Sequence, residues 1–157
     1  MKKITFAAAA MAALGIAGAA IGASHADPAI AGAIKARKAT MQLYAYNLGQ
    51  LGAMAKGDME YDADAAQAAA DNLVALSGLN QMAMWPQGSD NTSGAETRAL
   101  PALWEDMAGV EEAAGALHTA AMSMAEVAGN GVEAIQANMG ALGGGCGGCH
   151  KAYRAAD

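Results

Sequence analysis

The segment Cys146-Gly147-Gly148-Cys149-His150 constrains the fold of this chain most strongly, and it uses the only two cysteines among the 157 residues. A helix places positions i, i+3 and i+4 on one face, so it would bring both thiols and the histidine together. Two thiols at this spacing can add to the two vinyl groups of a haem, and the next histidine can reach the iron. The segment predicts one haem c, covalently bound through two thioethers by Cys146 and Cys149, with His150 as proximal iron ligand.

Three other uses of this segment have to be weighed. A structural disulfide between Cys146 and Cys149 suits an oxidising compartment, but it gives His150 no role. A thioredoxin-like pair needs a βαβ setting, and the sequence has no strand-like alternation. A zinc site needs four ligands. The next histidine, His118, is far away in the sequence and is expected at the surface or at the edge of the core.

Apolar residues at intervals of three and four predict two helices in the first half of the chain. The first begins after Asp27, a good N-cap, with Pro28 at its first position, and it ends at Gly57. The second runs from about Asp62 to Gly78. The first helix carries the seam of a bundle, made of Ile30, Ile34, Arg37, Met41, Tyr44, Leu48 and Leu51.

Two further helices are predicted after a polar loop that spans about residues 80–100 and is long for a compact domain. Pro101 opens the third helix, which continues to Met124. Asn130 and Glu133 form a capping-box pair for the last helix, which carries the haem segment. Short connections place neighbouring helices antiparallel, so the sequence predicts an all-α fold, an antiparallel up-down four-helix bundle.

The first 26 residues are typical of a secretory signal peptide. Met1-Lys2-Lys3 precedes an uncharged, Ala-rich run from Ile4 to Ala23 and small residues before a cleavage point after Ala26. The run could also span a bilayer, but its Ala and Gly content makes it only weakly hydrophobic. We expect residues 1–26 to be removed, which leaves a periplasmic domain over 27–157 without a membrane span.

The charge of residues 27–157 restricts the partners. Without Lys2 and Lys3, seven basic side chains face fifteen acidic ones, a net charge of −8. Such a domain repels phosphate backbones and anionic membranes, so no nucleic acid or lipid partner is expected. A redox protein with a basic docking patch is favoured instead.

The composition leaves room for a bulky cofactor. The single Phe, Phe6, lies in the signal segment, so the core depends on Ala, Leu, Val and Met. Five glycines stand in or beside the haem segment, at positions 143, 144, 145, 147 and 148. Each costs about 1 kcal/mol relative to Ala in a helix interior. Close approach of a porphyrin to the backbone would explain that cost.

The chain resembles the class II cytochromes c, the cytochrome c prime family, in which the haem segment lies near the C-terminus of a four-helix bundle. The landmarks stand in the same order and spacing over residues 27–157. They are Ile34-Lys35-Ala36-Arg37, Tyr46-Asn47-Leu48-Gly49-Gln50-Leu51-Gly52-Ala53-Met54, Tyr61-Asp62-Ala63, Thr97-Arg98-Ala99-Leu100-Pro101-Ala102-Leu103-Trp104 and Cys149-His150-Lys151-Ala152-Tyr153-Arg154.

This resemblance implies roles for further residues. The sixth iron position lies one turn after Arg37, at Met41, and low-spin members of the family have a methionine ligand there. Met41 could instead be a core filler, and Met54, Met107 or Met124 could compete for the iron. Arg37 would pair with a haem propionate or extend to the bundle end.

The same resemblance places Arg154 near the axial histidine and Tyr153 against the haem. It also raises the expectation of a homodimer through the first two helices.

The function expected from these features is single-electron transfer by a low-spin haem with His150 and Met41 as ligands, because this ligation raises the reduction potential. The alternative is a five-coordinate or Met-displaceable haem protein that binds nitric oxide or carbon monoxide, as cytochrome c prime proteins do. Neither function implies substrate chemistry, so the chain is not expected to be an enzyme.

Overall fold

The computed structural model describes residues 27–156. The predicted signal peptide, residues 1–26, and Asp157 lie outside the described residues. The long helices of the described part are α1 (Pro28–Lys56), α2 (Ala63–Ser77), α4 (Met107–Ala125) and α5 (Val132–Tyr153). Shorter elements are α3 (Ala102–Glu105) and the 3-10 turns η1 (Met82–Met84) and η2 (Ala128–Asn130).

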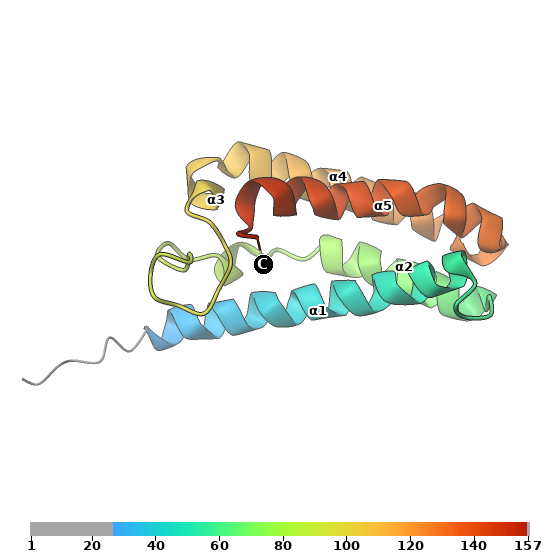
Figure 1. Cartoon of the computed structure of the whole chain (residues 1–157), viewed down its shortest axis with the longest axis horizontal. Coiled ribbons are helices and arrows are strands. Elements are labelled where there is room, and N and C mark those ends of the chain that lie inside the picture. The colour runs from blue at the N-terminus through green and yellow to red at the C-terminus, as the bar shows by residue number, and fades with distance from the viewer. Residues whose placement is uncertain (1–26, 157) are drawn as a thin grey trace, which may run out of the picture.

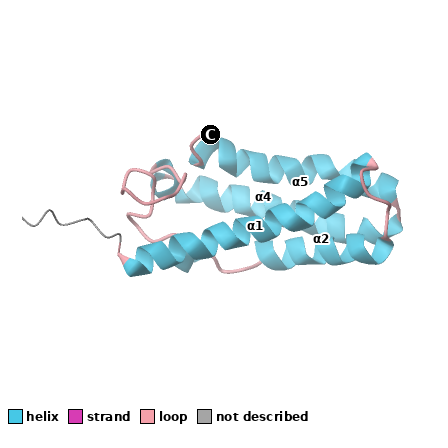
Figure 2. Cartoon of the chain, turned by 60° about the horizontal axis from the view of Figure 1, so that its bottom comes forward, coloured by secondary structure: helices cyan, strands magenta, loops and turns pink. Residues whose placement is uncertain are grey.

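The long helices run side by side as an up-down bundle (Figure 1 and Figure 2). α1 packs against α2 and α5, and α4 packs against the same two helices. Within the described residues, the β pairing is confined to an isolated antiparallel bridge between Ala99 and Arg154. The predicted all-α, antiparallel up-down four-helix bundle is therefore confirmed.

Local sequence signals set the ends of the first two helices. The Asp27 carboxylate accepts a hydrogen bond from the amide of Ala29 at 2.9 Å, and the Asp62 carboxylate accepts one from Ala65 at 2.9 Å. Each bond satisfies an amide that has no partner within its helix. α1 ends at Gly57, whose φ of 78° is the left-handed conformation that favours glycine.

The packed core fills the half of the bundle that contains the α1–α2 and α4–α5 connections. Its fully buried side chains come from all four long helices, and the largest are Leu51, Met54, Leu73, Met124, Ile135 and Leu142. The other half, where α1 begins and α5 ends, contains the long loop and a cavity. No helix within residues 27–156 has both the length and the apolar character needed to cross a bilayer.

The predicted third helix, continuous from Pro101 to Met124, is wrong because the backbone leaves the helical region at Asp106 (φ −130°, ψ 62°). Asp106 ends α3 and caps α4, since its carboxylate accepts a hydrogen bond from the Gly109 amide at 3.0 Å. A short side-chain acceptor can replace a helical backbone bond in this way, and periodicity alone does not reveal it.

The predicted capping box of Asn130 and Glu133 is also wrong. The N-cap of α5 is Gly131, with a φ of 119°, and no side chain caps this helix. The Asn130 side chain instead donates to the Glu126 carbonyl at 3.5 Å. The Gly131 amide donates to the Tyr61 hydroxyl at 2.9 Å, so a distant side chain accepts a hydrogen bond from the N-cap amide of α5.

Candidate functional site

A cavity of about 760 Å³ opens between the first half of α1, the loop that follows η1 and the end of α5. Figure 1 shows these two helices separated at this end of the bundle. Six of the seven site residues predicted from the sequence line the cavity: Arg37, Met41, Cys149, His150, Tyr153 and Arg154. The seventh, Cys146, lies one turn before Cys149 on α5. The volume is typical of a cofactor site.

Cys146 and Cys149 are both half-buried on α5 and both free in this structure. Burial raises the pKa of each thiol, and the charge of Cys146 adds to this rise at Cys149. The reactive cysteine of a thioredoxin-like pair has a lowered pKa instead, so the environment of these thiols disfavours that alternative.

The zinc alternative lacks a ligand set in the described part of the chain, which contains no group of three or more His, Cys, Asp or Glu side chains placed to hold a metal ion. His118 lies on α4, half-buried, with its Nδ1 atom 2.9 Å from the Ser77 hydroxyl on α2. It does not line the cavity. This position at the edge of the core agrees with the expectation for His118.

His150 is exposed on the last turns of α5, and Arg154 lies beside it. The Arg154 guanidinium, which can only donate, is 3.4 Å from Nδ1 of His150. The segment around Ala99 holds the end of α5 in place, because the Leu100 amide donates to the Tyr153 carbonyl at 2.9 Å. The predicted proximity of Arg154 to the histidine is therefore present.

Tyr153 is buried, and its hydroxyl donates to the Asp106 carboxylate at 2.6 Å. This bond raises the pKa of Tyr153 to about 12 and lowers the pKa of Asp106. A Cβ atom at Gly109 would overlap both the Tyr153 hydroxyl and the Asp106 carboxylate, so this α4 position needs a glycine. The bond joins the wall of the cavity to the start of α4.

Met41 differs from the other methionines considered as iron ligands. It lines the cavity and is 37% exposed, although the sequence placed it on a buried stripe. Met54 and Met124 are buried in the packed core, and Met107 does not line the cavity. Met41 is thus the member of this group that an occupant of the cavity would meet, and its ligation of the iron stays a prediction.

Arg37 is 3% exposed and attaches the loop to α1. Its guanidinium donates to the Ser89 hydroxyl and to the Thr97 hydroxyl, each at 2.7 Å, and lies 4.6 Å from the ring centroid of Trp85. Burial lowers the pKa of Arg37, and the charge of Asp90 partly opposes this shift. The Arg37 side chain is buried against the loop and not extended into solvent, and its pairing with a propionate stays a prediction.

Several residues of this region were not identified from the sequence. Trp104 packs edge-on against Trp85 with 6.3 Å between the ring centroids, and its indole nitrogen donates to the Trp85 carbonyl at 3.0 Å. Both tryptophans of the chain thus flank the loop that Arg37 holds. Two indoles next to a polar loop, in a chain with few aromatic residues, could have indicated a packed cluster there.

Helix packing gives a structural reason for one of the five glycines in and beside the haem segment. A Cβ atom at Gly145 would lie 2.9 Å from the Leu117 Cα atom, so this glycine lets α5 pack closely on α4. At Gly143, Gly144, Gly147 and Gly148 a Cβ atom would meet nothing within 4 Å. Helix packing therefore explains why the conformational cost of a glycine is accepted at Gly145. At the other four positions no atom of this chain would contact an added Cβ atom.

The residues of the site fit a covalently attached haem. The thiols share the α5 face with His150, which immediately follows them, as thioether attachment and axial ligation require. The cavity offers apolar surface from Met41, Ala45 and Leu103. It also offers cationic side chains that complement the propionate groups of a haem.

Comparisons with known proteins agree with this fit. The family model described as Cytochrome C′ matches residues 32–154. Cytochrome c-554 of Cereibacter sphaeroides is 40% identical over 124 residues, which cover 79% of this chain and 93% of that protein. Cytochrome c′ of the same species is 36% identical over 121 residues, which cover 77% and 81% of the respective chains.

Solved structures give the same result. A cytochrome c′ from Rhodobacter spheriodes superposes with a TM-score of 0.79 at 34% identity, covering 82% of this chain and 98% of that one. A cytochrome c′ with ligand-controlled dimer dissociation gives 0.75 at 30% identity, with coverage of 83% and 100%. The nitrosyl complex of a variant of cytochrome c′ from Alcaligenes xylosoxidans gives 0.70 at 27% identity, with coverage of 82% and 98%.

Proposed function

The chain belongs to the cytochrome c′ family, whose proteins bind one covalently attached c-type haem, and we propose that it is a periplasmic protein that binds nitric oxide or carbon monoxide. The haem, when bound, supplies an iron atom that can take up a diatomic gas or exchange one electron. In this proposal Cys146 and Cys149 form the thioethers, His150 is the proximal ligand, and Met41 occupies the sixth position as a displaceable ligand.

Met41 is the candidate sixth ligand because of its position in the cavity. Met41 comes from α1, whereas Cys149 and His150 come from α5, so two different helices bound the same space. A methionine side chain has three rotatable bonds and a soft sulfur atom, which suits a ligand that can move aside. Its side chain lines the cavity, whereas Leu51 on the same helix is fully buried in the packed core.

The comparisons support gas binding over the electron-carrier function that the sequence first suggested. Relatives from several genera are named cytochrome c′, and one structure similar to this chain is a nitrosyl complex. The low-spin electron carrier with a permanent His150–Met41 ligand pair is the second candidate, and the methionine at position 41 is the observation that favours it. Neither function includes the conversion of a substrate.

Optical spectra of the purified protein, oxidised, reduced and exposed to carbon monoxide, test the proposal. We expect the reduced protein to change its spectrum with carbon monoxide. Met41→Leu should bind the gas several-fold more tightly because no side chain competes for the iron. Met122→Leu, an exposed α4 position, is the matched control and should behave as the wild type.

Two other results would change the assignment. A sharp low-spin spectrum that changes with carbon monoxide only after Met41 is replaced would establish the electron carrier instead. Identical gas affinity in the wild type and Met41→Leu would remove Met41 from the iron but leave gas binding at an open site.

The proposed location rests on the N-terminal pattern and on the start of the folded domain. α1 begins at Pro28 with Asp27 as its cap, directly after the proposed cleavage point at Ala26. Intact mass measurement of protein from the periplasmic fraction should give a chain that begins at Asp27. A chain that keeps residues 1–26 in the membrane fraction would show an anchor instead.

Members of the family can form dimers, and we propose that this chain dimerises through α1 and α2. Leu43 and Tyr46 are one turn apart on α1 and are 53% and 66% exposed, which is unusual for large apolar side chains. Light scattering should give the mass of two chains, and Tyr46→Glu should shift it towards one. A wild-type mass of one chain at high concentration would contradict this part of the proposal.

A further inference from the structure

Basic side chains gather at the end of the bundle where the cavity opens. The cavity lining contains four of them, from Arg37, Lys38, Arg98 and Arg154, but a single carboxylate, that of Glu96. The chain from residue 27 onward carries a net charge of −8. The local charge around the cavity therefore has the opposite sign to the charge of the whole domain.

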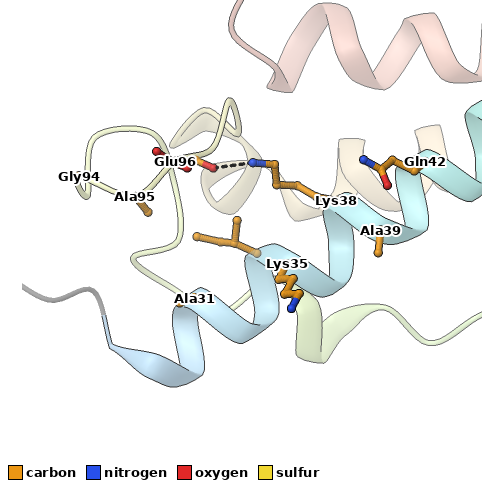
Figure 3. Close-up of a pocket in the computed structure, with 9 residues that line it drawn as sticks. Ala31, Lys35, Lys38, Ala39, Gln42, Gly94, Ala95 and Glu96 are labelled. Carbon is orange, nitrogen blue, oxygen red and sulfur yellow. Dashed lines mark hydrogen bonds between the residues drawn. The ribbon is translucent and has the colours of Figure 1, made fainter.

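Two further lysines extend this basic surface. A neighbouring hollow of about 560 Å³ shares Lys38 and Glu96 with the cavity and adds Lys35 (Figure 3). Lys151, which directly follows His150 on α5, is exposed. The Lys38 ammonium donates to the backbone carbonyl of Glu96 at 3.2 Å, and this neutral partner does not cancel its charge. We define the basic mouth as Lys35, Lys38, Arg98, Lys151 and Arg154.

The opposite end of the bundle has the reverse charge. Exposed carboxylates surround the α1–α2 and α4–α5 connections, at Asp58, Glu60, Asp62, Asp64, Glu126 and Glu133. Of the basic residues from position 27 onward, only Lys56, at the end of α1, belongs to this half. Lys56 and Lys38 are 18 residues apart on one helix, which corresponds to about 27 Å.

We propose that the basic mouth is the docking surface for an acidic protein partner. At physiological ionic strength charges act over only about 8 Å, so an approaching protein responds to the side chains it meets and not to the distant carboxylates. The five basic side chains of the mouth stand against Glu96, against Asp90, whose charge acts on Arg37, and against the two propionate carboxylates of a bound haem. Complementary charge speeds the encounter and orients it, which brings the partner to the opening of the cavity.

The proposed partner has an acidic docking surface, whereas the sequence led us to expect a basic one. The net charge of −8 favoured a partner with a basic docking patch, which would fit the acidic far end. A partner that exchanges electrons with the site, or that responds to its occupancy, has to approach the opening of the cavity, where the cations are. The kinetic test below rests on the proposed haem site, whereas the binding test does not.

The binding test uses fluorescently labelled poly-L-glutamate as the probe and fluorescence anisotropy of the full protein as the measurement. Binding should weaken as ionic strength rises from about 10 mM to 0.2 M. The double variant Lys38→Glu, Lys151→Glu should bind at least about five-fold more weakly. The single variants Lys38→Glu and Lys56→Glu change the net charge equally, so Lys56→Glu is the matched control and should stay within about two-fold of the wild type. Equal weakening by the two single variants, or no binding at low salt, would overturn the proposal.

The kinetic test measures how fast ferrous EDTA, an anion, reduces the oxidised protein, with one electron leaving the ferrous complex as it becomes ferric. If the basic mouth controls the approach, the rate should fall as salt is added, whereas the net charge of −8 alone would make it rise. Poly-L-glutamate should slow the reaction, and poly-L-lysine should not. A rate that rises with salt would overturn the proposal even if haem attachment and gas binding are confirmed.

Discussion

The Tyr153 hydroxyl donates a 2.6 Å hydrogen bond to the Asp106 carboxylate and so links the last turn of α5 to the start of α4. Asp106 also caps α4 through the Gly109 amide, so one carboxylate serves two elements. Because Tyr153 follows His150 by three residues on the cavity wall, this link fixes the part of α5 that carries the predicted axial ligand.

Tyr153→Phe should lower the free energy of unfolding at pH 7. In the folded chain the pKa of Asp106 is below its usual 3.8, so the stabilisation from this carboxylate is present above pH 3.8 and is lost as the pH falls further. The pKa of Tyr153 rises from 10.0 to about 12, so its stabilisation is present below pH 10 and is lost between pH 10 and 12.

Urea unfolding of both proteins at several pH values checks this prediction. The difference between wild type and Tyr153→Phe should be largest near neutral pH and should shrink at both extremes. Tyr46→Phe, at an exposed position, is the control and should match the wild type throughout. A pH-independent difference would show that the hydrogen bond does not couple to these titrations.

Gly145→Ala should destabilise the bundle by about 1–3 kcal/mol, because the new Cβ atom would press on the Leu117 backbone and force α5 away from α4. The neighbouring Gly144→Ala meets nothing within 4 Å, so it should stabilise the helix by about 0.5–1 kcal/mol. Urea unfolding of the two variants measures both effects, and equal shifts in the same direction would contradict the packing explanation.

Arg37→Met should free the loop from α1 and cost about 3 kcal/mol, because it leaves the hydroxyl groups of Ser89 and Thr97 and the Ser89 carbonyl without their charged donor. Lys35→Met, two positions before Arg37 and exposed, should change stability by less than about 0.5 kcal/mol. Limited proteolysis should cut the loop faster in Arg37→Met only. Equal resistance of both variants would show that the loop is held by other contacts.

Replacing both Cys146 and Cys149 with Ala should abolish covalent haem, because no other cysteine is available for a thioether. The mass of the denatured protein detects the attached group directly. His150→Ala should alter the haem spectrum, whereas His118→Ala, which loses only the contact to Ser77, should leave it unchanged. Covalent haem retained without both cysteines would contradict the proposed attachment.

The elements and the chemistry that depend on residues close together in the chain could be predicted from the sequence. The caps Asp27 and Asp62, the helical seams and the Cys146–His150 segment depend on residues within one or two turns, and such local patterns are legible along a chain. The antiparallel bundle followed, because short connections leave neighbouring helices few other arrangements.

Features that join residues far apart in the chain could not be predicted from local patterns and became visible in the folded chain. Asp106, where the third helix breaks, accepts a hydrogen bond from Tyr153, 47 residues away, and the guanidinium of Arg37 finds its partners in Ser89 and Thr97. Net charge, a sum over the whole chain, likewise does not reveal the basic lining of the cavity, because folding brings Lys38 and Arg154 together there. A net charge taken from composition does not say where the charges lie. An approaching partner, however, responds only to charges within about 8 Å.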